Sequence, residues 1–195
     1  MLRSLNFLDI PAVVHIHSEG LADDFLPSLG HRFLEGLYAC MLEDQQVFGY
    51  VYEESKTIHG FILGCEDTSR LFRNTLTRRP IFLIGRLAPS LIRKPQLLWK
   101  VGQTLLYPSA EPASDIKAEL VVVVVDEAVR GTGIGQRLVA RLETAFLERG
   151  IDAYKVTVNQ SNEKANLFYK RLGGELTGAF SLYGKDWNMY CFQPK

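Results

Sequence analysis

The sequence predicts a single α/β domain in which helices flank a mixed β-sheet. Two pairs of strand-like segments, residues 47–53 with 57–65 and residues 176–183 with 186–192, are joined by short turns, as in antiparallel hairpins. Residues 117–125 include five successive valines, which are typical of a central strand buried on both faces. Since 195 residues with 47% hydrophobic content suit one core, we assign residues 1–195 to one domain.

The remaining elements are predicted from apolar spacing and from residues that begin or end helices. Asp9 followed by Pro11 indicates a helix N-terminus, where the Asp side chain can cap exposed N–H groups. Gly150 indicates the end of a helix. In chain order we expect a strand at 2–7, a helix from Asp9 whose face carries Val13, Val14, Ile16 and His17, a helix at 30–43, the first hairpin, the valine strand, a helix at 133–149, a strand at 153–158, a helix at 161–172 and the second hairpin.

The composition excludes several classes of function. Lys plus Arg and Asp plus Glu both number 22, so no net charge favours nucleic acid as a partner. Cys40, Cys65 and Cys191 lack the short spacings of zinc sites, so we expect no metal and a reduced, cytoplasmic setting. We find neither a signal peptide nor an apolar run of membrane-spanning length. The oligomeric state stays open.

A glycine-rich turn follows the valine strand and leads into the next helix. It reads Arg130-Gly-Thr-Gly-Ile-Gly135. Free backbone N–H groups and the positive end of the helix dipole meet at such a turn, which favours a phosphate or pyrophosphate ligand. The dinucleotide fingerprint G-x-G-x-x-G fails because Gln136 stands at the third glycine position, and no Gly-Lys-Ser/Thr follows for a triphosphate loop. A turn without any ligand is the alternative.

Two blocks of residues resemble the GNAT superfamily of acetyl-CoA-dependent N-acetyltransferases. The turn resembles its Arg/Gln-x-x-Gly-x-Gly/Ala signature, and residues 158–173 are similar to its V-x-x-x-N-x-x-A-x-x-x-Y-x-x-x-G pattern. The similarity covers about residues 119–174, with Gly174 standing where Phe is usual and Glu127 where Pro is common. It implies a mostly antiparallel sheet of about six to seven strands, acetyl-CoA as co-substrate and no metal. The matched residues of the second block are Val158, Asn162, Ala165, Tyr169 and Gly173.

The resemblance implies which residues bind the cofactor. Main-chain groups of the valine strand would pair with the pantetheine amides, and N–H groups of the turn would hold the pyrophosphate, with an arginine adding charge. The asparagine that begins the following helix would touch the cofactor, although an N-cap role is an equal alternative. The expected set is Val123, Val125, Arg130, Gly131, Thr132, Gly133, Ile134, Gly135, Gln136 and Asn162.

Two catalytic residues are expected on the same basis. Direct acyl transfer needs a neutral amine, a base or water path for its proton, and an acid for the departing thiolate. By resemblance the Tyr169 hydroxyl would lie near the cofactor sulfur; the alternative is a core aromatic residue. Glu119 resembles the base of histone acetyltransferases in the superfamily, and burial at the strand rim could raise its proton affinity. The alternative is a solvated acid at a strand end.

An insertion at about residues 68–112 precedes the valine strand and is expected to form short helices. Residues 68–110 include eight basic residues and no acidic one, which disfavours a polyamine or Lys-rich tail as acceptor and favours a group that carries phosphate. We therefore expect acetyl transfer to the primary amine of a small molecule, with an amino sugar as one candidate. The alternatives are a solvated helical cover, peripheral contact with an anionic membrane, peptide or protein N-acetylation, and a non-catalytic acyl-CoA-binding module.

Overall fold

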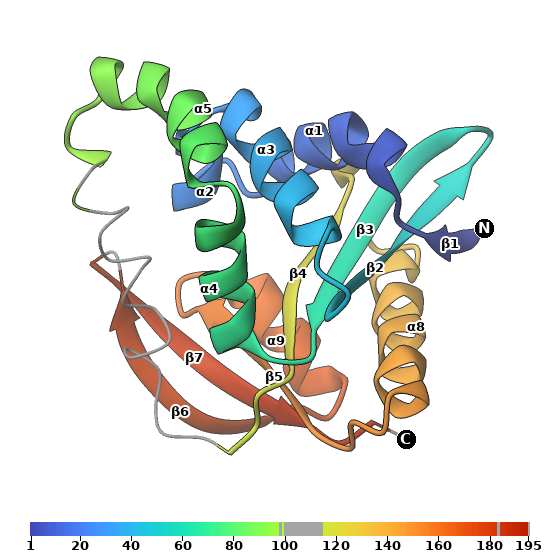
Figure 1. Cartoon of the computed structure of the whole chain (residues 1–195). Coiled ribbons are helices and arrows are strands. Elements are labelled where there is room, and N and C mark those ends of the chain that lie inside the picture. Colours follow the sequence, from blue (N-terminus) through green and yellow to red (C-terminus); the bar gives the residue numbers. More distant parts are fainter. Residues whose placement is uncertain (98, 100–114, 183, 195) are drawn as a thin grey trace.

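The computed structural model describes residues 1–97, 99, 115–182 and 184–194 and contains a seven-stranded sheet in the order β1-β2-β3-β4-β5-β7-β6 (Figure 1). Neighbouring strands are antiparallel except for the parallel pair β4 and β5, so the predicted mixed, mostly antiparallel sheet is confirmed. The strands are β1 (Leu2–Ser4), β2 (Val47–Glu54), β3 (Thr57–Cys65), β4 (Glu119–Val125), β5 (Tyr154–Asn159), β6 (Glu175–Leu182) and β7 (Lys185–Phe192).

Helices cover both faces of the sheet and give it two hydrophobic cores. On one face, α1 and α3 pack against β2, β3 and Val124 of β4, and the helices of the insertion lie outside them. On the other face, α8 packs against β2, β3 and β4, and α9 packs against β5 (Figure 1). The helices are α1 (Ile10–Gly20), α2 (Phe25–Ser28), α3 (His31–Leu42), α4 (Thr68–Arg78), α5 (Pro80–Arg93), α8 (Ile134–Glu148) and α9 (Glu163–Arg171).

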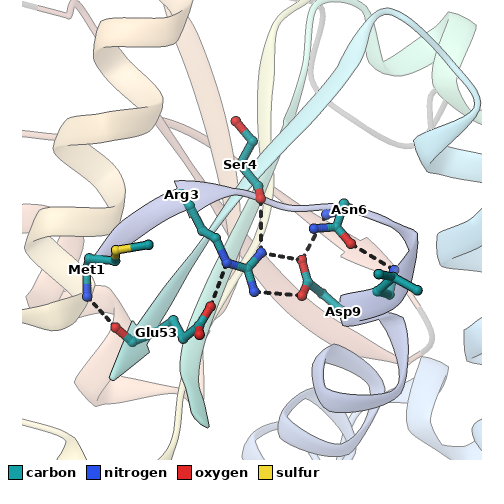
Figure 2. Close-up of polar contacts among 7 residues, drawn as sticks. Met1, Arg3, Ser4, Asn6, Asp9 and Glu53 are labelled. Atoms are coloured by element: carbon teal, nitrogen blue, oxygen red, sulfur yellow. Dashed lines mark hydrogen bonds and ion pairs between the residues drawn. The ribbon is translucent and has the colours of Figure 1, made fainter. Parts of the chain in front are cut away.

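The N-terminal segment is held by a charged network around Arg3 (Figure 2). The guanidinium donates to both carboxylate oxygens of Asp9, at 2.7 and 2.8 Å, and to Glu53 on β2 at 2.6 Å. Asp9 also accepts the N–H of Asn6 and makes no side-chain cap to α1, which corrects the expected capping role. The predicted strand stops at Ser4 because Asn6 caps a 3-10 turn (Phe7–Asp9) instead. A bidentate ion pair outcompetes a single cap bond.

The described part of the insertion forms two amphipathic helices, as expected. Leu71 of α4 and Leu83 and Leu87 of α5 are buried against the α1–α3 core, and Arg86 contacts Glu35 of α3. Residues 98 and 100–112 of the predicted insertion lie outside the residues that the structure describes. In the described parts of the chain, no helix has the length and apolar content needed to cross a bilayer.

Candidate active site

The glycine-rich turn joins β4 to the N-terminus of α8. Gly131 and Gly133 have φ angles of 82° and 85°, a conformation that side chains rarely adopt. α8 begins at Ile134, so the N–H groups of its first turn have no partner inside the helix. Among the described residues, no hydrogen bond takes up the N–H groups of 131–136. These groups are therefore open to an anionic ligand at the positive end of the α8 dipole.

Side chains of the turn fix its shape. The Thr132 hydroxyl donates to the Val129 carbonyl at 2.7 Å, and Arg130 Nε donates to the Val125 carbonyl at 3.0 Å. A Cβ placed on Gly135 would lie 3.5 Å from Phe168 Cζ of α9, which is ordinary van der Waals contact, so the start of α8 lies beside α9. Arg130 is exposed and lies between the end of β4 and the glycine turn, where its charge adds to the anion site.

β4 offers an unpaired edge beside this turn. β4 and β5 pair only at Glu119 with Lys155 among the described residues, and the strands then diverge. The N–H of Asp126, the residue after β4, donates to the carbonyl of His59 on β3. The backbone groups of successive residues in a strand point to opposite sides. The main-chain groups of Val123 and Val125 therefore point away from β3, toward the gap between β4 and β5. A ligand with amide groups can add there as a strand would.

A cavity of about 320 Å³ begins in this gap and passes between β4 and helices α1 to α4. Its β-side wall comes from β4 and β5, with Asn162, Ala165 and Tyr169 from the α9 segment. Its helical wall is mainly aliphatic and aromatic. The size is at the lower end of that of small-molecule pockets. One continuous space therefore connects the unpaired edge of β4 with a chamber beneath the N-terminal helices.

Tyr169 borders the cavity and is otherwise buried, with 5% of its surface exposed. Its ring contacts Phe168, Tyr190 and Phe192, which hold it in one orientation. Burial raises the pKa of its hydroxyl well above the usual value near 10, so the phenol stays protonated. Within the described residues no hydrogen bond to this hydroxyl is formed, and a protonated donor is thus available at the cavity.

The α9 N-terminus is built on two asparagines. The Asn162 side chain accepts the N–H of Ala165 at 3.1 Å, so its N-cap role is real, and it also borders the cavity. Asn166 is buried; its amide donates to the Asn162 carbonyl, and its oxygen accepts from Asn188 and Tyr190 of β7. This network ties α9 to the sheet and fixes the position of Tyr169 one turn later.

Glu119 is buried where β4 and β5 pair, with 4% of its surface exposed. Its carboxylate accepts from the Thr68 hydroxyl at 2.7 Å and from the Thr157 hydroxyl at 3.4 Å. Glu119 is not part of the cavity wall, whereas Thr157 is. The nearby Cys65 has a thiol whose pKa is raised by burial and then by the Glu119 charge, so this cysteine is inert. The solvated-acid alternative for Glu119 is therefore wrong.

His17 is a wall residue to which the sequence assigned no role. It lies on the buried face of α1, its Nδ1 is 2.6 Å from the Tyr38 hydroxyl of α3, and both side chains border the cavity. Burial lowers the pKa of His17 to about 4, so the imidazole is neutral near pH 7. The spacing with Val13, Val14 and Ile16 already placed His17 on the core face, but its partner is 21 residues away and not visible to a local pattern.

The departure at Gly174 has a structural explanation. A Cβ at this position would lie 2.5 Å from Phe192 Cζ and 3.1 Å from the Tyr169 carbonyl. The ring of Phe192 on β7 thus fills the space beside residue 174 and stacks on Tyr154. Packing at the start of β6 is supplied from β7, and Tyr169 keeps its aromatic neighbours.

A glycine turn at a helix N-terminus, an unpaired parallel strand edge and an adjoining buried cavity together define an enzyme that binds an acyl-coenzyme A. Residues 12–174 match the Acetyltransferase (GNAT) family, and the chain belongs to that family. The family uses acetyl-CoA, and the protein is an acetyl-CoA-dependent N-acetyltransferase. Across the described residues, no cluster of three His, Cys, Asp or Glu side chains could hold a metal ion.

Solved structures of low sequence identity share the fold. The ribosomal-protein-S18-alanine N-acetyltransferase from Escherichia coli is 15% identical, with a TM-score of 0.65 over 100% of this chain and 94% of that chain. An N-acetyltransferase from Staphylococcus aureus Mu50 is 14% identical, with a TM-score of 0.63 over 100% and 98%. The yncA protein of Salmonella typhimurium, solved with its cofactor acetyl-CoA, is 14% identical, with a TM-score of 0.63 over 100% and 94%.

Proposed function

We propose that the protein transfers the acetyl group of acetyl-CoA to the primary amine of a small molecule, by direct attack in a ternary complex. The observation that carries the proposal is the single cavity that joins the open β4 edge to a buried chamber and has Tyr169 on its wall. Both substrates can meet inside such a space without a covalent enzyme intermediate.

The proposed cofactor site runs along β4 and into the glycine turn. The N–H groups of Gly131, Thr132, Gly133, Ile134, Gly135 and Gln136 hold the diphosphate, and Arg130 adds charge. The main-chain groups of Val123 and Val125 bind the pantetheine amides, and Asn162 contacts the cofactor beside its own cap bond. The divergence of β4 and β5 supports this assignment because it leaves this edge of β4 without a partner strand; the pantetheine would replace the exposed Arg130 side chain as the partner of the Val125 carbonyl.

Tyr169 is the proposed general acid. Burial keeps the phenol protonated, so its O–H can donate a hydrogen bond to the thioester sulfur and pass its proton on as the leaving thiolate develops negative charge. The surrounding rings exclude water and fix the direction of the hydroxyl.

Glu119 is the proposed proton acceptor, acting through Thr157. The attacking amine must lose a proton, and the Thr157 hydroxyl links the cavity wall to the buried carboxylate. The parallel pairing of Glu119 on β4 with Lys155 on β5 keeps this carboxylate at the closed end of the gap. Nδ1 of the neutral His17 on the opposite wall is engaged by Tyr38, and the other ring nitrogen is a hydrogen-bonding group for the amine.

The acceptor is a small molecule rather than a peptide because the chamber is buried among α1 to α4. The basic insertion favoured an amino sugar as the acceptor. The chamber wall gives sugar hydroxyls few partners, so we do not propose an amino sugar. Membrane contact has one supporting observation, the exposed Ile81, Ile84 and Ile92 beside the basic residues of α5. We place the reaction in the cytoplasm, because this compartment supplies acetyl-CoA and keeps cysteines reduced, as the sequence leads us to expect.

Thiol release from acetyl-CoA, measured with a panel of small amines and a panel of peptides, tests the proposal. Turnover with small amines that exceeds turnover with peptides is expected. Acetylation of peptide N-termini alone, seen by mass spectrometry, would contradict the acceptor class. Binding of acetyl-CoA with no turnover on either panel would instead indicate a non-catalytic module.

A further inference from the structure

The chamber at the helical end of the cavity has an almost wholly apolar wall. We call it the acceptor chamber, and it lies on the side of β4 that α1 to α4 cover. Helix α2 contributes Leu26, which is half-buried, and Leu29, which is buried, directly follows this helix. Facing side chains come from the buried face of α3 and from the first turns of α4. The chamber is lined by Leu26, Leu29, Phe33, Leu37, Leu71 and Phe72.

Most polar groups near the acceptor chamber are paired with the protein, whereas the buried hydroxyl of Thr75, which also borders the cavity, has no partner among the described residues. His17 and Tyr38 bond to each other at 2.6 Å. Asp24 lies 3.6 Å from Lys185, the first residue of β7. These two pairs leave few donors or acceptors for the hydroxyls of a bound ligand, whereas the leucine and phenylalanine side chains offer continuous apolar contact.

The chemistry of such a wall discriminates strongly between acceptors. A buried ligand hydroxyl without a partner lowers affinity by about 5- to 150-fold. A methylene group moved from water into an apolar site raises affinity by about fourfold. A chain of four or five methylene groups therefore gains far more here than a sugar ring of similar size.

We propose that the acceptor is a primary amine bearing an apolar alkyl or aryl group, which lies in the acceptor chamber while the amine faces the gap between β4 and β5. This inference rests on the proposed function and deepens it by naming the acceptor class. The acetyl donor enters along β4, so the chamber at the opposite end of the cavity belongs to the second substrate.

The first test compares amines with acetyl-CoA held constant. Rates of thiol release are measured for n-alkylamines from ethyl to hexyl, for 2-phenylethylamine and for glucosamine. We expect kcat/KM to rise about two- to fourfold per methylene and to be lowest for glucosamine. Comparing the n-alkylamines with 2-phenylethylamine shows whether the acceptor chamber prefers an alkyl or an aryl group. A flat series, or glucosamine exceeding hexylamine, would overturn the inference and leave the proposed function standing.

A second comparison decides whether the acceptor chamber holds the acceptor or a longer acyl chain. Hexanoyl-CoA with ethylamine is measured against acetyl-CoA with hexylamine, which move the same carbon atoms to opposite sides of the amide bond. The inference predicts that the acetyl-CoA pair reacts at least tenfold faster. A faster hexanoyl-CoA pair would overturn it.

Binding without turnover separates this inference from the proposed function. Calorimetry measures the Kd of hexylamine for the protein saturated with coenzyme A, with Leu26→Asn as the test variant and Leu147→Asn as the matched control. Leu147 is 44% exposed on α8, so the same change there leaves the chamber intact. We expect Leu26→Asn to weaken hexylamine about tenfold and the control to leave it unchanged. Equal Kd values in both variants would overturn the inference, even if no amine were turned over.

Discussion

The hydroxyl of Tyr38 lies 2.6 Å from Nδ1 of His17, and this pair joins α1 to α3 at the wall of the cavity. Burial lowers the pKa of His17 from its ordinary 6.5 to about 4. Below pH 6.5 His17 binds a proton in the unfolded chain, whereas in the folded chain it stays neutral until the pH falls to about 4. The contribution of His17 to stability is therefore present above pH 6.5 and is lost as the pH falls toward 4.

The variant His17→Asn removes this titration while keeping a small polar side chain. Urea unfolding at pH 7.0 and pH 4.5 gives the free energy of unfolding in each case. Between these pH values the wild type should lose about 2 kcal/mol more than the variant, because the interval covers most of the range between the two pKa values of 6.5 and about 4. An equal loss in both proteins would show that His17 does not titrate as its burial predicts.

Replacing Tyr169 with Phe removes the proposed acid and keeps the aromatic packing. The kcat should fall about 100-fold, because general acid catalysis contributes on that scale, while the Kd for acetyl-CoA stays unchanged. Tyr154→Phe is the matched control, since Tyr154 is buried in the same core but bonds Glu143 and is not part of the cavity wall. If Tyr154→Phe were as inactive as Tyr169→Phe, the loss of activity would result from disturbed folding and not from the missing hydroxyl of Tyr169.

The two ends of α8 allow the anion site to be tested against backbone strain alone. Gly133 before the helix and Gly150 after it both have positive φ, 85° and 71°, and neither has a backbone atom or another side chain closer than 4.0 Å to an added Cβ. Alanine at either position should cost about 1 kcal/mol of stability from the left-handed conformation. Only Gly133→Ala should also weaken acetyl-CoA binding, by about tenfold in calorimetry. Similar weakening by Gly150→Ala would argue against the turn as the diphosphate site.

Gly174 and Phe192 should be energetically coupled. Gly174→Ala places a Cβ 2.5 Å from the Phe192 ring and should destabilise the protein by about 1–3 kcal/mol. In a Phe192→Leu background the same change should cost less, because the ring that it meets has gone. Thermal or urea unfolding of the four proteins gives the coupling; additive effects would mean that Phe192 does not fill this space.

The Arg3 network should matter for stability and not for catalysis. Asp9→Asn removes one charge from a bidentate pair and should cost about 2 kcal/mol. Arg3, by its hydrogen bonds, holds the pKa of Asp9 below its usual range, so this contribution is present above about pH 4 and is lost as the pH falls further. The check is the free energy of unfolding at pH 7; unchanged stability would contradict it.

Signals that lie within a few residues of one another predicted most of the fold. The polar turn after Glu53 located the first hairpin, and Gly150 located the end of α8, because turns and helix ends depend on local backbone preferences. Local preference also misled: Asp9 is a good capping residue, but its carboxylate is bound by Arg3 of β1, which also donates to Glu53 of β2. The short helix α2 lies just before the helix expected at residues 30–43, in a segment where the sequence predicted no element.

The same distinction between local signals and contacts of distant residues applies to the site. The glycine turn and the spacing from Asn162 to Tyr169 are local, so the cofactor half could be proposed from sequence. The environment of Glu119 could not, since Thr68 is 51 residues away in sequence and Thr157 is 38 away. The acceptor chamber is assembled from α2, α3, α4 and β4, and its apolar character appears only when these elements are packed together.

A crystal structure of the protein grown with acetyl-CoA tests the central claim most directly. The account predicts the diphosphate within hydrogen-bonding distance of the N–H groups of residues 131–136, the pantetheine bonded to the main chain of Val123 and Val125, and the sulfur beside the Tyr169 hydroxyl. A diphosphate bound away from the α8 N-terminus, or a pantetheine outside the gap between β4 and β5, would contradict it.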